Sequence, residues 1–96
     1  LIASLGDKNA MILRNHGLLA LGDSIATAFT RAYYLEKACQ IQLDAMATCA
    51  ELRLPPPEVC AHAARQFDGF YEGDATRLDW EANRRAIDRL NPGYDA

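Results

Sequence analysis

Residues 10–22 read AMILRNHGLLALG and decide which kind of fold the chain can adopt. Residues 10–13 form an apolar run too short for a helix, and a second apolar run occupies residues 18–21. Runs of this length, bounded by polar residues or glycine, favour strands that are buried on both faces. The polar step Asn15-His16-Gly17 separates the two runs. We therefore predict two short strands with this step between them.

The residues that follow predict a long helix. Either Asp23 or Ser24 can accept hydrogen bonds from the free amides of a first turn. Apolar residues then recur every three or four positions, so we expect one apolar helical face that ends near Leu52 or Arg53, before three prolines. This face comprises Ile25, Ala28, Phe29, Ala32, Leu35, Cys39, Leu43, Met46 and Ala50. The opposite face carries the polar residues Arg31, Lys37, Gln40 and Asp44.

Two further helices are expected in the second half of the chain. One begins at the prolines, since proline is well tolerated in a first turn, and it should break between Gly69 and Gly73. The other runs from about Thr76 to Leu90, before Pro92 and Gly93. Their apolar positions are Val59, Ala63, Phe67 and Phe70 in the first, and Trp80, Ile87 and Leu90 in the second.

Composition and charge exclude several classes of protein. Half of the 96 residues are hydrophobic and 24% are charged, which is typical of a globular domain and not of a disordered chain. The net charge of −3 provides no basic footprint for nucleic acid or an anionic membrane surface. No apolar run approaches the roughly 20 residues of a membrane span. The sequence also begins without the features of a signal peptide, so we expect a cytoplasmic protein.

The three cysteines, Cys39, Cys49 and Cys60, are odd in number and include no C-x-x-C pair. This pattern favours reduced and packed thiols over disulfides or a zinc knuckle.

Two features indicate that the chain belongs to a larger domain. It starts at Leu1 without a methionine, and residues 1–5 read as the last turn of a helix before a turn at residues 6–9. Two short strands make only a marginal sheet, yet the long helix has a broad apolar face to cover. We therefore expect residues 1–96 to be the C-terminal portion of one domain whose upstream part is absent. A self-contained helical domain with a hairpin is the alternative.

The stretch from Gly6 to Gly22 resembles the corresponding segment of class II aldolase and adducin proteins. The likeness covers about the first half of the chain, returns faintly near the C-terminus, and includes Ser24, Ala28, Phe29, Tyr34, Leu35, Glu36, residues 38–42, Trp80 and residues 91–94. It implies a three-layer α/β/α fold, usually a homotetramer with active sites at subunit interfaces. This chain would contribute two short strands, the long helix and the two further helices.

The resemblance also implies a chemistry. Many family members bind zinc or another divalent ion through three histidines and cleave or form carbon–carbon bonds in small sugar phosphates. Others epimerise, dehydrate or decarboxylate related hydroxy-keto substrates. The histidine of the Asn-His-Gly step is one ligand, which maps onto His16. The two others, in a His-x-His element, and the acid/base carboxylate lie upstream in the family and are not present in this sequence.

Three neighbouring roles follow from the same resemblance. Asn15 would orient the imidazole or a nearby loop by hydrogen bonding, as residues around metal ligands do. Gly17, which lacks a Cβ, would let backbone and substrate approach closely. A tail tyrosine from a neighbouring subunit can act as an acid in catalytic relatives, and Tyr94 is the corresponding candidate here.

Plainer interpretations stand beside these. A histidine between two strands is often structural, and the adducin branch keeps similar flanking sequence as a binding or scaffold module without metal. His62 has no other ligand at suitable spacing and is expected at a helix surface.

Other side chains are assigned to packing or solvent. Trp80 should anchor the last helix, and Tyr33 and Tyr34 should make core or subunit contacts. Glu36 and Asp44 would lie about 12 Å apart along a helix, too far to share a proton.

Overall fold

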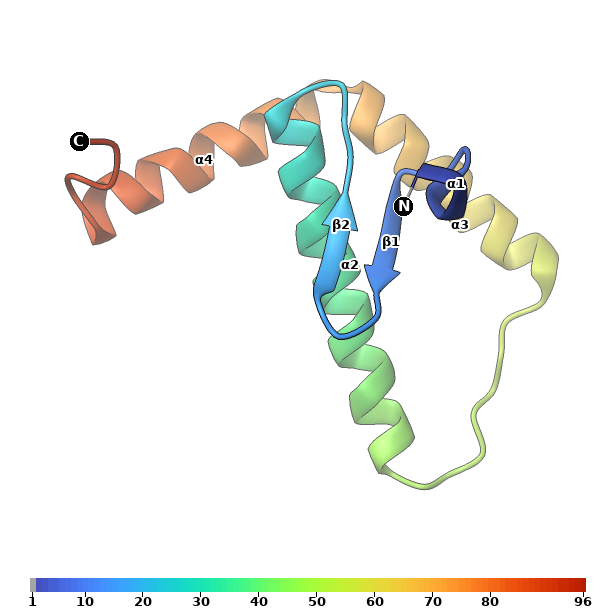
Figure 1. Cartoon of the computed structure of the whole chain (residues 1–96). Coiled ribbons are helices and arrows are strands. Elements are labelled where there is room, and N and C mark those ends of the chain that lie inside the picture. The colour runs from blue at the N-terminus through green and yellow to red at the C-terminus, as the bar shows by residue number, and fades with distance from the viewer. Residues whose placement is uncertain (1) are drawn as a thin grey trace.

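The computed structural model describes residues 2–96, with the backbone alone at Glu72, and Leu1 lies outside the described residues. The elements are α1 (Ile2–Leu5), β1 (Ala10–Leu13), β2 (Gly17–Ala20), α2 (Ile25–Ala47), α3 (Pro57–Glu72) and α4 (Asp74–Leu90). Figure 1 shows the β1–β2 hairpin lying along the first half of α2. Helices α3 and α4 meet near the start of α2 and extend from there in different directions.

The two strands form an antiparallel hairpin in which Ala10 pairs with Ala20 and Leu13 pairs with Gly17. The N–H of Leu21 also donates to the Asn9 carbonyl at 2.8 Å, which extends the pairing beyond the strands. The predicted strands are confirmed, with β2 placed one residue earlier than expected. Their predicted burial on both faces is wrong. Helix α2 packs against β2, but the Ile12 side chain stays 66% exposed because no described element covers it.

Helix α2 begins at a side-chain cap. Ser24 has an extended backbone, and its Oγ accepts a hydrogen bond from the Thr27 amide at 3.1 Å and donates to Thr27 Oγ1 at 3.0 Å. Of the two predicted cap residues, the structure therefore uses Ser24. Thr27 and Thr30 are only 6% and 3% exposed, and the Thr30 hydroxyl donates to the Ala26 carbonyl. This first part of α2 is the best-packed part of the described chain.

Replacing the capping serine gives the first testable prediction. Ser24→Ala leaves the Thr27 amide without its acceptor, so we expect the free energy of unfolding of the intact gene product to fall by about 1 kcal/mol. Thermal or denaturant unfolding followed by circular dichroism measures the change. Ser4→Ala, at an exposed serine of α1, is the control and should have little effect. Equal effects of the two substitutions would contradict the capping role.

The end of α2 differs from the prediction. The helix stops at Ala47 instead of continuing to Leu52 or Arg53. The Thr48 hydroxyl donates to the Ala45 carbonyl at 2.8 Å, and Cys49 adopts a left-handed backbone (φ 60°) with its N–H donating to Met46 O. A left-handed residue after the last turn ends a helix by satisfying its free carbonyls. Residues 51–56 then have no regular structure.

The thiols are also less buried than expected. Cys39 is partly exposed, and Cys49 and Cys60 are exposed, because they lie on either side of the segment without regular structure. The prediction of packed cysteines is therefore wrong for these last two.

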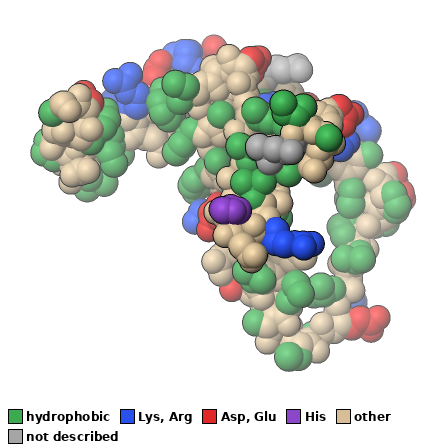
Figure 2. All heavy atoms as spheres, in the orientation of Figure 1, with side chains coloured by type: hydrophobic (Ala, Val, Ile, Leu, Met, Phe, Trp, Pro, Cys, Tyr) green, Lys and Arg blue, Asp and Glu red, His purple; other side chains and the backbone are tan. Residues whose placement is uncertain are grey.

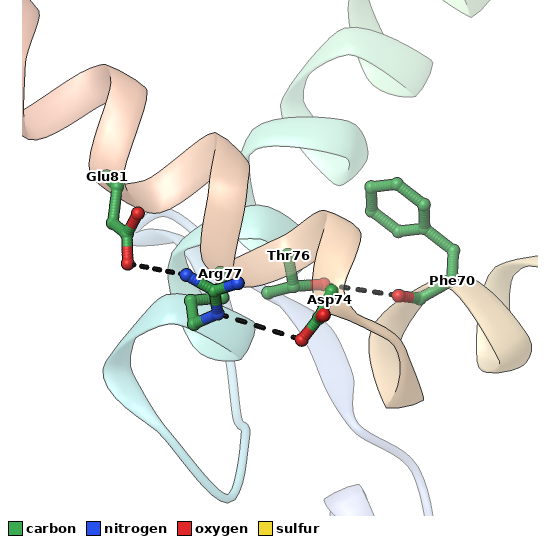
Figure 3. Close-up of polar contacts among 5 residues, drawn as sticks. All are labelled: Phe70, Asp74, Thr76, Arg77 and Glu81. Atoms are coloured by element: carbon green, nitrogen blue, oxygen red, sulfur yellow. Dashed lines mark hydrogen bonds and ion pairs between the residues drawn. The ribbon is translucent and has the colours of Figure 1, made fainter.

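Helices α3 and α4 join at a single glycine. Helix α3 starts at Pro57, as predicted, but it continues through Gly69 and ends at Glu72, just before Gly73. Helix α4 starts at Asp74 instead of Thr76. The Thr76 hydroxyl, in a residue only 4% exposed, donates to the Phe70 carbonyl at 3.4 Å and ties the two helices together (Figure 3). Arg77 pairs with Asp74 and Glu81 on the solvent side, where ion pairs add little stability.

Aromatic contacts connect α2 to the two later helices. Phe29 meets Trp80 edge to face with ring centroids 5.3 Å apart, so Trp80 anchors α4 as predicted. Tyr34 contacts Phe67 and Phe70 of α3 in the same geometry, at 5.4 and 6.0 Å. Such pairs add roughly 0.5–1.5 kcal/mol beyond the burial of their area.

The chain nevertheless lacks a closed core. No hydrophobic side chain among the described residues is fully buried, and Leu43 and Met46 on the predicted apolar face of α2 are 61% and 51% exposed. Ile25 at the start of this face is also 75% exposed, so the predicted face packs mainly in its middle, between Ala28 and Cys39. The radius of gyration is 16.1 Å, whereas a compact domain of this length has about 13 Å. Much of the apolar surface of the described residues is therefore exposed to solvent.

Candidate functional site

The turn between β1 and β2 presents His16. The His16 amide donates to the Leu13 carbonyl at 3.3 Å and closes a four-residue turn. Asn15, the third residue of this turn, has a φ of +62°, and asparagine tolerates this left-handed region better than most residues. We call Asn15, His16 and Gly17 together the NHG turn.

The backbone conformation at position 17 favours glycine, whereas the space around this position would admit a side chain. Gly17 has a φ of +121°, a value that L side chains rarely adopt. A Cβ built at this position would meet no atom within 4 Å. The space beside His16 is therefore open, and a ligand could approach the backbone there without displacing a side chain.

The His16 side chain is exposed, and its imidazole makes no hydrogen bond to the residues that the structure describes. Figure 2 shows histidine atoms, coloured purple, at the surface on this side of the molecule. Among residues 2–96, no group of three or more His, Cys, Asp or Glu side chains is placed to hold a metal ion. His62 is exposed on α3, as predicted for a surface residue. The chain thus presents one imidazole at this position.

Tyr94 lies elsewhere. It is 43% exposed and lines a hollow of about 330 Å³ together with Phe29, Trp80, Asn83, Arg84 and Ile87. Figure 1 shows the C-terminal end of α4 far from the NHG turn. Within one chain, the fold therefore does not bring Tyr94 to His16.

The surroundings of Arg31 differ from the prediction. The sequence pattern places this residue on the polar, solvated face of α2. Its Nη1 donates to the Leu21 carbonyl at 2.8 Å, and its guanidinium carbon lies 4.8 Å from the centroid of the Tyr71 ring. Arg31 is therefore half-buried where α2, α3 and the base of the hairpin meet. A signal was available: Arg31 follows Thr27 by four positions and precedes Leu35 by four, so the three share a helix face.

A polar cavity surrounds this arginine. It has a volume of about 340 Å³ and is lined by Asn9, Asp23, Arg31, Asp68 and Tyr71. Burial raises the pKa of the Tyr71 hydroxyl above its ordinary value, the charge of Arg31 lowers it, and Tyr34 and Asp68 raise it further. Tyr71 therefore stays neutral at physiological pH and offers an uncharged ring face to the guanidinium.

Comparison with known proteins identifies the fold. A crystal structure of an aldolase II superfamily protein from Pseudomonas syringae superimposes with a TM-score of 0.86 at 41% sequence identity, covering 99% of this chain and 38% of that one. The profile of the class II aldolase and adducin N-terminal domain matches residues 1–43. This chain belongs to the class II aldolase and adducin family. The predicted family and its α/β fold are thereby confirmed.

Two branches of the family are represented among the relatives. A Pseudomonas aeruginosa protein named "Putative aldolase class 2 protein" is 40% identical over 95 residues, which are 96% of this chain and 37% of that protein. The alpha-adducin of Rattus norvegicus is 44% identical over 101 residues, covering 95% of this chain and 14% of the adducin. This chain thus spans little more than a third of the length of the bacterial relatives that it matches. No described helix is long and apolar enough to cross a membrane.

Proposed function

We propose that the intact gene product is a metal-dependent aldolase-type lyase, or a related epimerase or decarboxylase, with His16 as one metal ligand. Its substrate class would be a small sugar phosphate or a hydroxy-keto acid. The observation that carries the proposal is the NHG turn, which holds an exposed imidazole between a left-handed asparagine and a glycine with open space beside it. The likeness to bacterial class 2 aldolase proteins supports the same assignment.

The donor chemistry fits zinc, but this chain provides one donor. A neutral imidazole is a good zinc ligand, and catalytic zinc sites take three protein ligands and keep one position open. The further ligands, a His-x-His element by resemblance, and the acid/base carboxylate would come from outside these 96 residues. When bound, the metal would supply Lewis-acid stabilisation of the charge that develops as the carbon–carbon bond breaks. We therefore expect the 96-residue chain alone to be inactive.

The residues beside His16 would support this role in different ways. Asn15, fixed in its left-handed conformation, would hold the imidazole in its direction or hydrogen-bond to a neighbouring loop. Gly17 would leave room for substrate next to the ligand. Tyr94 would act as an acid at the site of a neighbouring subunit in a homotetramer. Its distance from His16 within one chain and its partial exposure are consistent with a role between subunits.

Metal content tests the proposal. Elemental analysis of the intact gene product should find about one divalent ion per chain. We expect His16→Ala to lose it, because two remaining ligands hold zinc far more weakly than three. His62→Ala, which removes an exposed histidine from α3, is the matched control and should keep the metal. A metal-free wild type, or a His16→Ala variant that retains the ion, would rule out the proposed site.

The adducin relatives favour a second candidate, a binding or scaffold module without metal or catalysis. Alpha-adducin and the adducin-related protein 1 of Caenorhabditis elegans each match about 95% of this chain, at 44% and 33% identity. The same analysis separates the two functions, because the module predicts no bound metal in any variant. A His-x-His element elsewhere in the gene product would favour the enzyme, and its replacement would favour the module.

A further inference from the structure

We propose that Arg31 is a positioning residue for the NHG turn, acting through the hairpin and without touching His16. The inference rests on the proposed function, in which His16 is a metal ligand. It concerns how this chain holds that ligand in place.

The contacts of Arg31 join three elements at one point. Its Nη1 donates to the carbonyl of Leu21, the residue that follows β2. The N–H of the same Leu21 donates to the carbonyl of Asn9, the residue before β1, so this peptide closes the base of the hairpin. The guanidinium also lies over the Tyr71 ring of α3, with its central carbon 4.8 Å from the ring centroid. Arg31 thus fixes the hairpin base to both α2 and α3.

A small rotation at this base moves the NHG turn appreciably. Leu21 lies five positions after His16, a span of about 17 Å at roughly 3.4 Å per residue of extended strand. A rotation of about 3° at the base would therefore displace the imidazole by about 1 Å. Displacements of this size at a reacting group cost on the order of 100-fold in rate. Because a two-stranded hairpin is marginally stable by itself, its orientation depends on such an anchor.

Arginine suits this position better than lysine. The guanidinium donates to the Leu21 carbonyl through Nη1 while its central carbon lies over the Tyr71 ring. A planar group with several donors can make both contacts at once. The compact ammonium of lysine can donate to one acceptor but cannot stack in the same way. Asp23 and Asp68 line the same cavity as the guanidinium. The direction of the guanidinium is thus set from two sides.

The test compares three variants of the intact gene product. Arg31→Met removes the donor and the stacked plane, Arg31→Lys retains the charge, and Arg77→Met removes an arginine whose ion pairs lie on α4. Zinc affinity is measured by competition with a chromophoric chelator, at a temperature where circular dichroism shows each protein folded. Hydrogen exchange of the peptide spanning residues 9–21 is measured in parallel and without metal.

We expect Arg31→Met to weaken zinc binding about 10-fold or more and to speed exchange in the hairpin. Arg31→Lys should lose less, and Arg77→Met should stay within about twofold of wild type. Faster exchange with unchanged zinc affinity would make Arg31 merely structural and overturn the inference, as would no change in either measurement. If wild type binds no zinc while Arg31→Met still speeds hairpin exchange, the metal role of His16 fails and the anchor is supported.

Discussion

Replacing Gly22 by valine is expected to lower the free energy of unfolding of the intact gene product by about 3 kcal/mol or more. A Cβ at this position would lie 2.6 Å from the Ala28 amide nitrogen and 2.9 Å from Thr27 Cβ. These atoms belong to the first turn of α2, where the Ala28 amide donates to the Ser24 carbonyl at 3.0 Å. The side chain can therefore fit only if the best-packed turn of the chain moves.

Gly69→Ala is the matched control for this substitution. Gly69 lies inside α3, and a Cβ there would meet no atom within 4 Å. Alanine is the better helix former, so this change should raise the free energy of unfolding by roughly 0.5–1 kcal/mol. Denaturant unfolding of both variants and wild type measures the two effects. If Gly22→Val and wild type unfolded at the same denaturant concentration, the loop before α2 would have relaxed to accept the side chain, and the prediction would be wrong.

The predictions that succeeded depend on local signals. The hairpin follows from two short apolar runs around a polar turn, and the start of α2 follows from a serine that can accept from the helix amides. The end of α2 carries no comparable signal. Cys49 adopts the left-handed conformation that glycine usually provides, so the sequence pattern indicated instead the prolines that begin six residues further on.

Of the candidate site, the sequence predicts only the turn that carries His16. The NHG turn shows where a ligand could be placed, because asparagine and glycine accept the backbone that the turn requires. The role of Arg31 was not predictable from helical periodicity alone, since its partners Leu21 and Tyr71 come from other elements. Contacts of this kind depend on how the hairpin and α3 are placed around α2.

The second large effect concerns the 96 residues expressed alone. Among residues 2–96, seven isoleucine and leucine side chains are more than 60% exposed: Ile2, Ile12, Ile25, Ile41, Leu43, Leu54 and Leu90. Full burial of each would contribute about 1.5–3 kcal/mol, so leaving them in water forfeits on the order of 10 kcal/mol. That is comparable with the whole stability of an ordinary domain. We therefore expect a broad unfolding transition, strong binding of a hydrophobic dye, and association that increases with concentration.

Calorimetry, dye fluorescence and sedimentation at several concentrations would measure these three properties. The intact gene product is the control, and it should unfold cooperatively and bind little dye, because the same side chains would then be covered. Ile41→Lys with Leu43→Lys, on the exposed second half of α2, should make the isolated chain less prone to associate without disturbing the Ser24 cap. A monomeric isolated chain with a sharp heat-absorption peak would instead mean that the hairpin and helices form a self-sufficient domain.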